Sequence, residues 1–425
     1  MEKSHFRYLL IFTVVLLGTG SRSFSQVEKK TDDKNNAEKS ASKNSTESEA
    51  TDQNSQKDVK PGVETTDGPE ESKDTSQKKD ADNQVDARRK ELQDKCKHLK
   101  PRIESILKLY YKQKENSASR SPWGIMHAMV AFGPYAEMYG DGKLVKDVDW
   151  LCQNGRCRSW TLMKLENGRL STNNGPGRQG HDGQFLAILA QSQIPKNKKL
   201  TVGGKEFTIE DLIQYEMKTC RPKTELTFKL IGLSHYIDSD ARWRSNDGRF
   251  WSLERLVREE LRQPINGTAC GGTHRLMGYS YSLLMRKLQK KPITGHWRRA
   301  EDFVTDFRQY AMKLQNQDGS FSTDWFKQRQ ARRDSQRRVQ TTGHILEWLV
   351  FSATEKELSD PRLIKAVDYL SNLMWSERTT EWEVGPKGHA IRALRLFYER
   401  ALLEPADRVA ERKSFDEKMM NLILR

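Results

Sequence analysis

A segment in which glycine and histidine precede a run of apolar residues recurs along this chain. One copy, "GHILEWLVFSA", begins at Gly343, and its apolar side chains occupy every face of the helix that it predicts. A helix that is apolar on all sides has to be surrounded by other elements. The histidines of the copies are His127, His181, His274, His344 and His389. The repeat therefore predicts several buried helices with a histidine near the start of each.

A sixth segment, "FKLIGLSHYI", matches the pattern with Phe228 in the place of histidine. Amphipathic segments alternate with the apolar ones. Those that begin at Gly204 and Gly248 are close copies, in which Thr208 and Ser252 are expected to be helix N-caps. Repeated helical hairpins bury their apolar faces by stacking on one another. Because the second helix of each pair is apolar throughout, closure into a ring is favoured over an open solenoid.

The predicted fold class is therefore all-α, an α/α toroid with about six inner and up to six outer helices. Small β-hairpin insertions are expected beside the helices. "KKLTVGGKEFT" has the Gly-Gly pair of a tight hairpin turn. The stretch between Gly140 and Gly180 is typical of short strands and turns, and we expect no outer helix there.

The first 25 residues have the pattern of a secretory signal peptide. Lys3 and Arg7 precede the apolar core "YLLIFTVVLL", and the small residues "SFS" precede Gln26. No later apolar run approaches the roughly 18 residues that a membrane span needs. We therefore expect export, to the periplasm or the extracellular space, and no transmembrane segment in the mature chain.

The remaining chain divides into three predicted parts. Residues 26–90 are almost entirely polar and charged, which predicts a disordered low-complexity linker because such a segment has no core to bury. Residues 91–405 hold the repeats and are expected to form the toroid domain. Residues 406–425 are expected to be a C-terminal helical tail.

The whole chain carries a net charge of +15, and its linker is acidic, so the basic charge belongs to the folded part. "FKQRQARRDSQRRVQ", residues 326–340, concentrates basic residues directly before one of the apolar helices. One interpretation is a solvated loop, and the other is attraction of an acidic polymer or a cell-envelope component. Nucleic acid is not expected as a partner, because the chain is predicted to be exported and has no nucleic-acid-binding motif.

"YAMKLQNQDGSFS", residues 310–322, resembles the QW repeat of terpene cyclases and protein prenyltransferase β subunits. Gln315 and the Asp318–Phe321 turn carry the likeness, with Phe321 where the family has tryptophan. Over roughly residues 120–400 the chain also looks like an uncharacterised family of exported bacterial proteins with this toroid. The resemblance implies a fold and a location, but no chemistry.

The chemistry of terpene cyclases and prenyltransferases is less expected than the fold. The Asp-x-Asp-Asp cluster of the cyclases that protonate an alkene does not occur. The prenyltransferase zinc site uses aspartate, cysteine and histidine. Cys270 and His274 lie near an inner-helix start, but Thr268 stands where that aspartate would be.

In a toroid the inner helices run parallel, so their first turns share one cavity mouth. The histidines of the repeat are expected there, together with Tyr279 and Arg392. The candidate catalytic pairs are His344 with Glu347 and His181 with Asp182, for acid–base chemistry or metal binding. The alternative is structural, with each histidine bonding carbonyls of the preceding loop. The sequence specifies neither a metal nor a cofactor.

The chain has five cysteines, and in an exported protein we expect four of them to form two disulfides. The tight Asn-Gly turn favours a bond between Cys152 and Cys157, and the shared mouth favours one between Cys220 and Cys270. Cys96 is left over. A catalytic Cys270 beside His274 is the alternative.

Two functions therefore remain open. The first is binding of a ligand, polymer or protein partner at the histidine-rich mouth. The second is an extracytoplasmic enzyme that acts in the toroid cavity on a polysaccharide-type substrate. The sequence does not decide whether the protein is an enzyme.

The linker supplies a direct test of the domain boundary. Because residues 26–90 offer no apolar core, we expect them to be dispensable for folding. Limited proteolysis should leave a stable fragment that begins near residue 90. Loss of the cooperative unfolding transition in that fragment would contradict the boundary.

Overall fold

The computed structural model describes residues 87–403. The predicted signal peptide, nearly all of the predicted linker and the predicted C-terminal helical tail lie outside the described residues. Those three predictions are therefore untested.

Helices account for 56% of the described residues and strands for 11%. This confirms a helix-rich fold with small sheets. Six helices are largely buried and correspond to the repeated apolar segments. They are α3 (Pro122–Phe132), α5 (Gln184–Gln191), α7 (Thr227–Tyr236), α9 (Thr273–Leu288), α11 (Ser335–Ser352) and α14 (Val384–Phe397).

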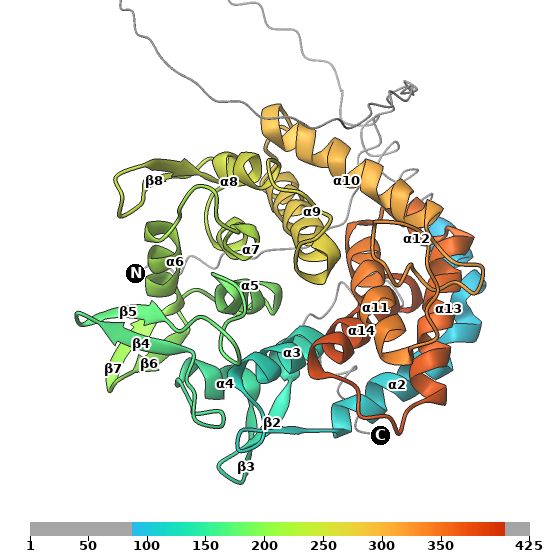
Figure 1. Cartoon of the computed structure of the whole chain (residues 1–425), viewed down its shortest axis with the longest axis horizontal. Coiled ribbons are helices and arrows are strands. Elements are labelled where there is room, and N and C mark those ends of the chain that lie inside the picture. The colour runs from blue at the N-terminus through green and yellow to red at the C-terminus, as the bar shows by residue number, and fades with distance from the viewer. Residues whose placement is uncertain (1–86, 404–425) are drawn as a thin grey trace, which may run out of the picture. The chain divides into compact units, whose positions relative to one another are not determined.

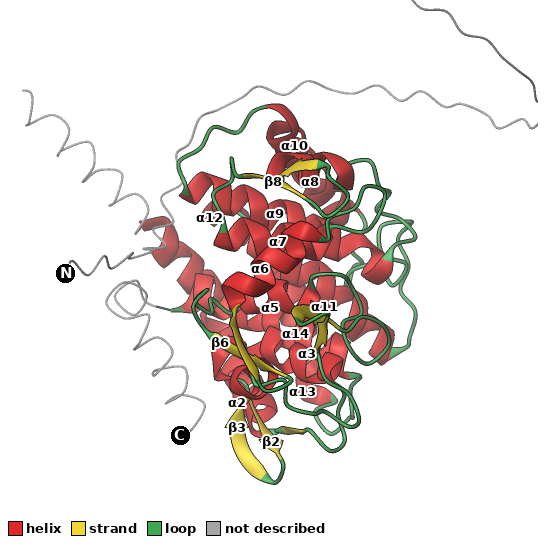
Figure 2. Cartoon of the chain, turned by 90° about the vertical axis from the view of Figure 1, so that its left-hand side faces the viewer, coloured by secondary structure: helices red, strands yellow, loops and turns green. Residues whose placement is uncertain are grey.

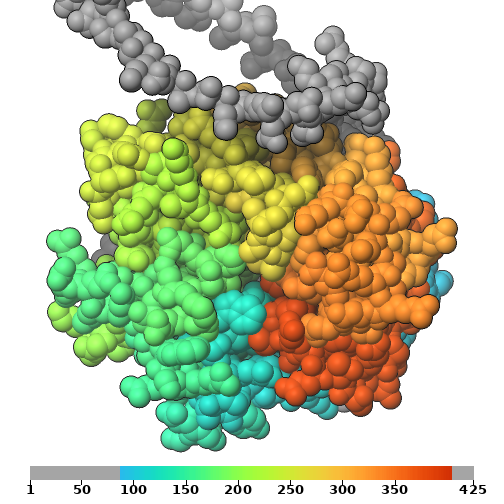
Figure 3. All heavy atoms as spheres, in the orientation of Figure 1, coloured from blue at the N-terminus to red at the C-terminus, as the bar shows by residue number. Residues whose placement is uncertain are grey.

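These buried helices contact one another in chain order. Helix α3 packs on α5, α5 on α7, α7 on α9, α9 on α11 and α11 on α14, and α14 packs back on α3. Figure 1 shows the six around a common centre. In the space-filling view of the same face, atoms from early, middle and late parts of the described chain fill the space where these segments meet (Figure 3).

A second set of helices packs against the buried six from outside. It comprises α2 (Lys100–Lys112), α4 (Asp147–Cys152), α6 (Ile209–Lys218), α8 (Leu253–Glu260), α10 (Gly295–Lys313) and α13 (Pro361–Ser376). Helix α6 contacts both α5 and α7, and α13 contacts α11 and α14. Amphipathic spacing explains the packing: Leu363, Val367 and Leu370 of α13 lie on one buried face. A short helix, α12 (Glu355–Leu358), connects α11 to α13.

The predicted N-caps are present in two of the outer helices. The hydroxyl of Ser252 accepts a hydrogen bond from the backbone N–H of Arg255 at 3.1 Å. At α6, the carboxylate of Asp211 accepts from the backbone N–H of Thr208 at 2.8 Å, as in a capping box. These caps begin the outer helices where the sequence predicts.

The strands form short sheets beside the helices (Figure 2). A three-stranded sheet has the order β1 (Glu115–Asn116), β2 (Glu137–Gly140), β3 (Lys143–Lys146). The antiparallel pairs are β4 (Met163–Glu166) with β5 (Arg169–Thr172), β6 (Lys199–Val202) with β7 (Lys205–Thr208), and β8 (Arg242–Arg244) with β9 (Phe250–Ser252). Pair β6–β7 turns at Gly203 and Gly204, both at positive φ, which confirms the predicted hairpin.

Two local predictions need correction. Residues Asp147–Cys152 form helix α4, where only strands and turns were expected, because six residues are too few to show an amphipathic period. Helix α11 begins at Ser335 with Asp334 as its cap, so His344 lies well inside the helix and not in its first turn. The charged residues that begin α11 resemble a loop in sequence, although Asp334 is a typical cap residue.

No helix among residues 87–403 combines the length and the apolar character that crossing a bilayer requires.

Glycines set the separation of three buried helices. A Cβ added to Gly343 of α11 would lie 2.9 Å from Cα of Ala390 in α14. A Cβ added to Gly388 of α14 would lie 2.5 Å from the carbonyl oxygen of His127 in α3. Both obstacles are backbone atoms, which a rotamer change cannot move aside. Gly343 and Gly388 are therefore packing residues.

We expect Gly388→Ala to destabilise the domain by about 1–3 kcal/mol, because α14 would have to move away from α3. Gly124 is a matched control, since it lies in helix α3 and an added Cβ would make only ordinary contacts, the nearest at 3.6 Å. Gly124→Ala should be neutral or stabilising by about 0.5–1 kcal/mol. Urea denaturation measures the unfolding free energy of both variants. Equal changes in the two would show that the close approach of α14 and α3 at Gly388 does not affect stability.

Candidate functional site

The five histidines of the repeat meet between the buried helices. The ring centroids of His344 and His389 are 3.9 Å apart, and those of His274 and His389 are 5.4 Å apart. His127 lies 5.5 Å from His389, and His181 lies 5.5 Å from His274. The prediction that these side chains gather in one place is confirmed.

Phe228, which replaces histidine in the sixth segment, completes the cluster. Its ring stacks on His181 at 4.6 Å and lies edge to face with His274 at 5.2 Å. Each of the six buried helices, or the turn before it, therefore contributes one ring. We call this set, the five histidines and Phe228, the ring cluster.

Two histidines of the cluster are fixed by carbonyls of their own helices. Nδ1–H of His127 donates to the carbonyl of Trp123 at 2.7 Å, and Nδ1–H of His344 donates to that of Gln340 at 2.7 Å. Since a carbonyl only accepts, the proton resides on Nδ1 and Nε2 is left with a lone pair. The structural alternative therefore holds for His127 and His344 in that each ring bonds a backbone carbonyl. The carbonyls belong to the helices of these histidines and not to the preceding loops.

Two other histidines are held by carboxylates from different segments. Nδ1 of His181 contacts Glu225 at 2.6 Å, and Nδ1 of His389 contacts Glu347 at 2.6 Å. The second oxygen of Glu347 accepts from Nη1 of Arg392 at 2.7 Å. Arg392 was placed at the cavity mouth by the sequence, and the structure does place it beside the ring cluster.

Neither predicted catalytic pair is formed. Glu347 faces α14 and binds His389, not His344, because α11 and α14 pack closely and Arg392 adds a charge there. Asp182 is exposed and hydrogen-bonds to Asn174, not to His181. Sequence spacing places residues on a helix, but it does not decide which neighbouring helix a side chain meets.

Tyr279 is also misplaced by the sequence prediction. Its ring packs edge to face against Phe303 of α10, at 5.7 Å, so it faces an outer helix and not the ring cluster. Burial raises the pKa of its hydroxyl. Tyr279 is therefore part of the packing between α9 and α10.

His274 is the anomaly of the cluster. Both of its ring nitrogens are buried, and neither has a hydrogen-bond partner among the described residues. Buried polar atoms in native proteins are almost always paired, so such an atom calls for an explanation. The rings of His181, His344 and His389 surround it, with centroids at 5.5, 5.6 and 5.4 Å from its own.

Cys270 approaches His274 from a strained turn. Its backbone has φ 48° and ψ 37°, and Gly271 and Gly272 follow at φ 62° and 83°. A Cβ added to Gly271 would lie 2.2 Å from Cγ of Trp325, so only glycine is accommodated there. Such backbone strain in a non-glycine residue often marks a functional position.

This turn brings three metal-ligating side chains together. The Sγ of Cys270, a ring nitrogen of His274 and a ring nitrogen of His344 all lie within 4.8 Å of one another. We call these three residues the ligand triad. In the sequence only the Cys270–His274 spacing indicated it, because His344 comes from a helix far along the chain.

Burial sets the protonation of these groups. Burial, together with the neighbouring His389, lowers the pKa of His127 to about 3. The same causes hold the pKa values of His274 and His344 well below the usual histidine value. Burial raises the pKa of the Cys270 thiol to about 12. At neutral pH these three imidazoles are therefore neutral and keep lone pairs for a metal or a proton.

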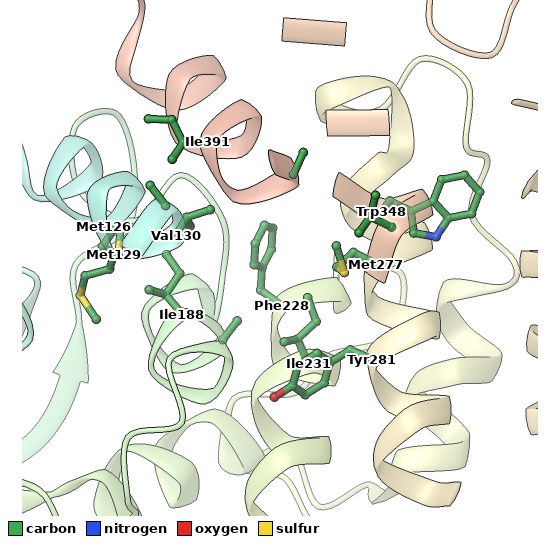
Figure 4. Packing of buried hydrophobic residues seen from close by; sticks show 14 of the residues in the cluster. Met126, Met129, Val130, Ile188, Phe228, Ile231, Met277, Tyr281, Trp348 and Ile391 are labelled. Carbon is green, nitrogen blue, oxygen red and sulfur yellow. The ribbon is translucent and has the colours of Figure 1, made fainter. Parts of the chain in front are cut away.

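A small cavity adjoins the cluster, with a volume of about 30 Å³. Its polar lining includes His127, His274, His344 and His389. Its apolar lining includes Val130, Ile188, Phe228, Ile231, Met277 and Trp348, whose side chains Figure 4 shows from several helices. The site is therefore a group of imidazoles beside a small cavity that apolar side chains also line.

The predicted disulfides are absent, and all five cysteines are free thiols in the structure. Cys220 does not meet Cys270, because its thiol contacts the carbonyl of Glu216 in α6 at 3.3 Å while Cys270 faces the histidines. The Cys157 thiol contacts the carbonyl of Gly155 at 3.9 Å and does not pair with Cys152. Where the thiols point was not predictable from their spacing.

Comparisons of the chain with protein-family models, with curated proteins and with solved structures found no match. The functional argument therefore rests on the geometry of the cluster.

Because burial depresses the pKa of His127, folding should weaken as the pH falls. The unfolded chain binds a proton at this residue below about pH 6.5, whereas the folded domain does so only near pH 3. Stability is therefore lost between those values, by about 1.4 kcal/mol per pH unit for each such histidine. Removing the His127 imidazole should reduce the pH dependence of the unfolding free energy by about 1.4 kcal/mol per pH unit in this range.

The variant His127→Gln, followed by urea denaturation at several pH values, measures that slope. His98 is exposed and lies outside the cluster, so His98→Gln is the matched control for the loss of one imidazole. An unchanged slope in His127→Gln would contradict the depressed pKa.

Proposed function

We propose that this protein is an exported domain of the α/α toroid type that binds one transition-metal ion through Cys270, His274 and His344. The observation that carries the proposal is the ligand triad, in which His274 has no hydrogen-bond partner among residues 87–403 for either ring nitrogen. A metal ion would satisfy one of the two ring nitrogens of His274 that have no partner among the described residues.

The donor set suits zinc and ions that resemble it. Thiolate and imidazole are the usual protein ligands of Zn²⁺, at about 2.3 Å and about 2.0–2.1 Å. Around a tetrahedral ion such donors lie roughly 3.3–3.6 Å apart. Donor atoms within 4.8 Å of one another reach that spacing through small side-chain movements. Three protein ligands also leave one coordination position for another group.

The surroundings of the triad support the proposal. The carbonyl of Gln340 fixes the tautomer of His344, so that Nε2 carries the lone pair. Neutral imidazoles bind metals without first losing a proton. Cys270 is a thiol before binding and releases its proton to the solvent when it coordinates the ion.

Two observations support the toroid. The buried helices contact one another in chain order, and the last contacts the first. In the QW-like segment, Gln315 donates to the carbonyl of Gly319 at 3.0 Å and to that of Arg362 at 2.8 Å. Gln315 thereby joins the end of an outer helix to the start of the next one, and Phe321 beside it is buried.

Prenyl transfer is not part of the proposal. Thr268, which stands in the place of the family's aspartate, donates its hydroxyl hydrogen to the carbonyl of Ile265 at 2.8 Å. The triad has a second histidine instead of a carboxylate. The metal set is therefore different from the one that the resemblance implies.

A polysaccharide-cleaving enzyme is supported by no particular observation. The predicted pair His344 and Glu347 is not formed, and a cavity of about 30 Å³ does not admit a sugar ring. Binding of an acidic polymer by residues 326–340 stays a prediction. Within this segment Arg329, Arg337 and Arg338 hydrogen-bond to other parts of the chain, which leaves less of its charge available.

Metal loading of the full-length chain tests the proposal. We expect one equivalent of Co²⁺ per chain, with visible bands of a tetrahedral ion and a near-ultraviolet thiolate-to-metal band. Cys270→Ser should abolish the thiolate band and weaken binding by about 100-fold or more, because one of three ligands is lost. Cys220→Ser, at a buried thiol outside the triad, is the matched control.

Absence of bound Co²⁺ in the folded chain would contradict the proposal. So would an unchanged thiolate band in Cys270→Ser. Circular dichroism of each variant separates loss of the site from loss of the fold.

A further inference from the structure

The outer side of the ligand triad is covered by a tryptophan. Trp325 packs edge to face against His344, with ring centroids 5.7 Å apart, and occupies the space beside Gly271. The next residue, Phe326, is buried and packs against Phe307 and Trp348. Phe326 therefore anchors Trp325 beside His344, although Trp325 and Cys270 are each partly exposed.

The inner side of the triad opens into the small cavity. His274 and His344 form part of its wall, whereas Cys270 does not. The cavity therefore lies on the histidine side of the triad, away from the thiol. A metal ion held by the three side chains would direct its remaining position toward this space.

The cavity wall offers an incoming ligand few charged partners. Glu347 is the only carboxylate among its lining residues, and both of its oxygens are already bound, to His389 and Arg392. Six of the fifteen lining residues are apolar, and Gln184, Gln191 and Thr273 add neutral polar groups. An incoming ligand therefore meets neutral groups rather than unpaired charges.

Size limits the ligand further. One water needs at least about 10–15 Å³ of such a volume, so the cavity of about 30 Å³ holds about two waters or a molecule of that size. An ion with one thiolate and two imidazole ligands keeps a net charge of about +1. A neutral molecule or a single negative charge is therefore acceptable at the remaining position.

We infer that the remaining position of the metal ion takes a small molecule or monoanion of two or three heavy atoms from this cavity, and that the cavity excludes larger ligands. This inference rests on the proposed metal site. The observations that carry it are Trp325 packed on His344, the position of the cavity on the histidine side of the triad, and the volume of the cavity.

The test compares two monoanions of different size on the Co²⁺-loaded full-length chain. Azide has three heavy atoms in a line, and propionate has five. Azide should shift the visible Co²⁺ bands, and propionate should bind at least about 10-fold more weakly. Because the charges are equal, the difference does not report charge, and the enlarged variants below separate size from donor-atom preference.

Enlarging the cavity should remove the discrimination. Met277 lines the cavity and is buried, so Met277→Ala should admit propionate and bring its affinity to within about 3-fold of that of azide. Met374→Ala is the matched control, because Met374 is a buried methionine of α13 and does not line this cavity. Ile231→Ala, on α7, gives a second enlargement where Met277→Ala fails to fold.

The outcomes separate the two proposals. If the folded chain binds no Co²⁺, the metal site itself is wrong. If Co²⁺ binds but azide leaves the bands unchanged, or propionate binds the unmodified chain as well as azide does, the cavity inference is overturned. Exclusion of propionate from a folded, enlarged variant would also overturn it.

Discussion

The close approach of α3, α11 and α14 is the constraint on which the ring cluster depends. Gly343 and Gly388 leave no room for a Cβ against the backbone of the neighbouring helix. Their neighbours in sequence, His344 and His389, are thereby brought to 3.9 Å between ring centroids. At these two positions the glycine permits the close approach of the helices, and the histidine that follows it lies between them.

Burial of so many imidazoles has an electrostatic consequence. A charged histidine would be costly in this environment, and burial keeps His127, His274 and His344 neutral by lowering their pKa values. Glu347 and Arg392 are buried in the same place, and the contacts of Glu347 with His389 and Arg392 hold the pKa of its carboxyl below the usual value despite burial. The cluster therefore combines unprotonated ligand atoms with a separately neutralised ion pair, an environment that accepts a cation bound through a thiolate.

The sequence analysis predicted which histidines belong to the ring cluster, but not which side chains they contact. The repeat predicted that the histidines meet, and Cys270 was noted near His274. The sequence analysis paired Glu347 with His344, although the carboxylate binds His389. It also predicted a disulfide between Cys220 and Cys270, although both cysteines are free thiols. Glu225 and Trp325 were not anticipated, because both lie in loops whose paths carry no periodic signal.

By itself the sequence determined the helix-rich fold, the N-caps of the outer helices, the Gly-Gly hairpin and the gathering of the five histidines. These features follow from local periodicity and turn chemistry, which neighbouring residues decide. Only the tertiary structure decided which carboxylate holds which histidine, that His274 is left unpaired, and that Cys270 joins it with His344. Those contacts depend on the rotation and separation of helices that are distant in the chain, and packing between them sets both quantities.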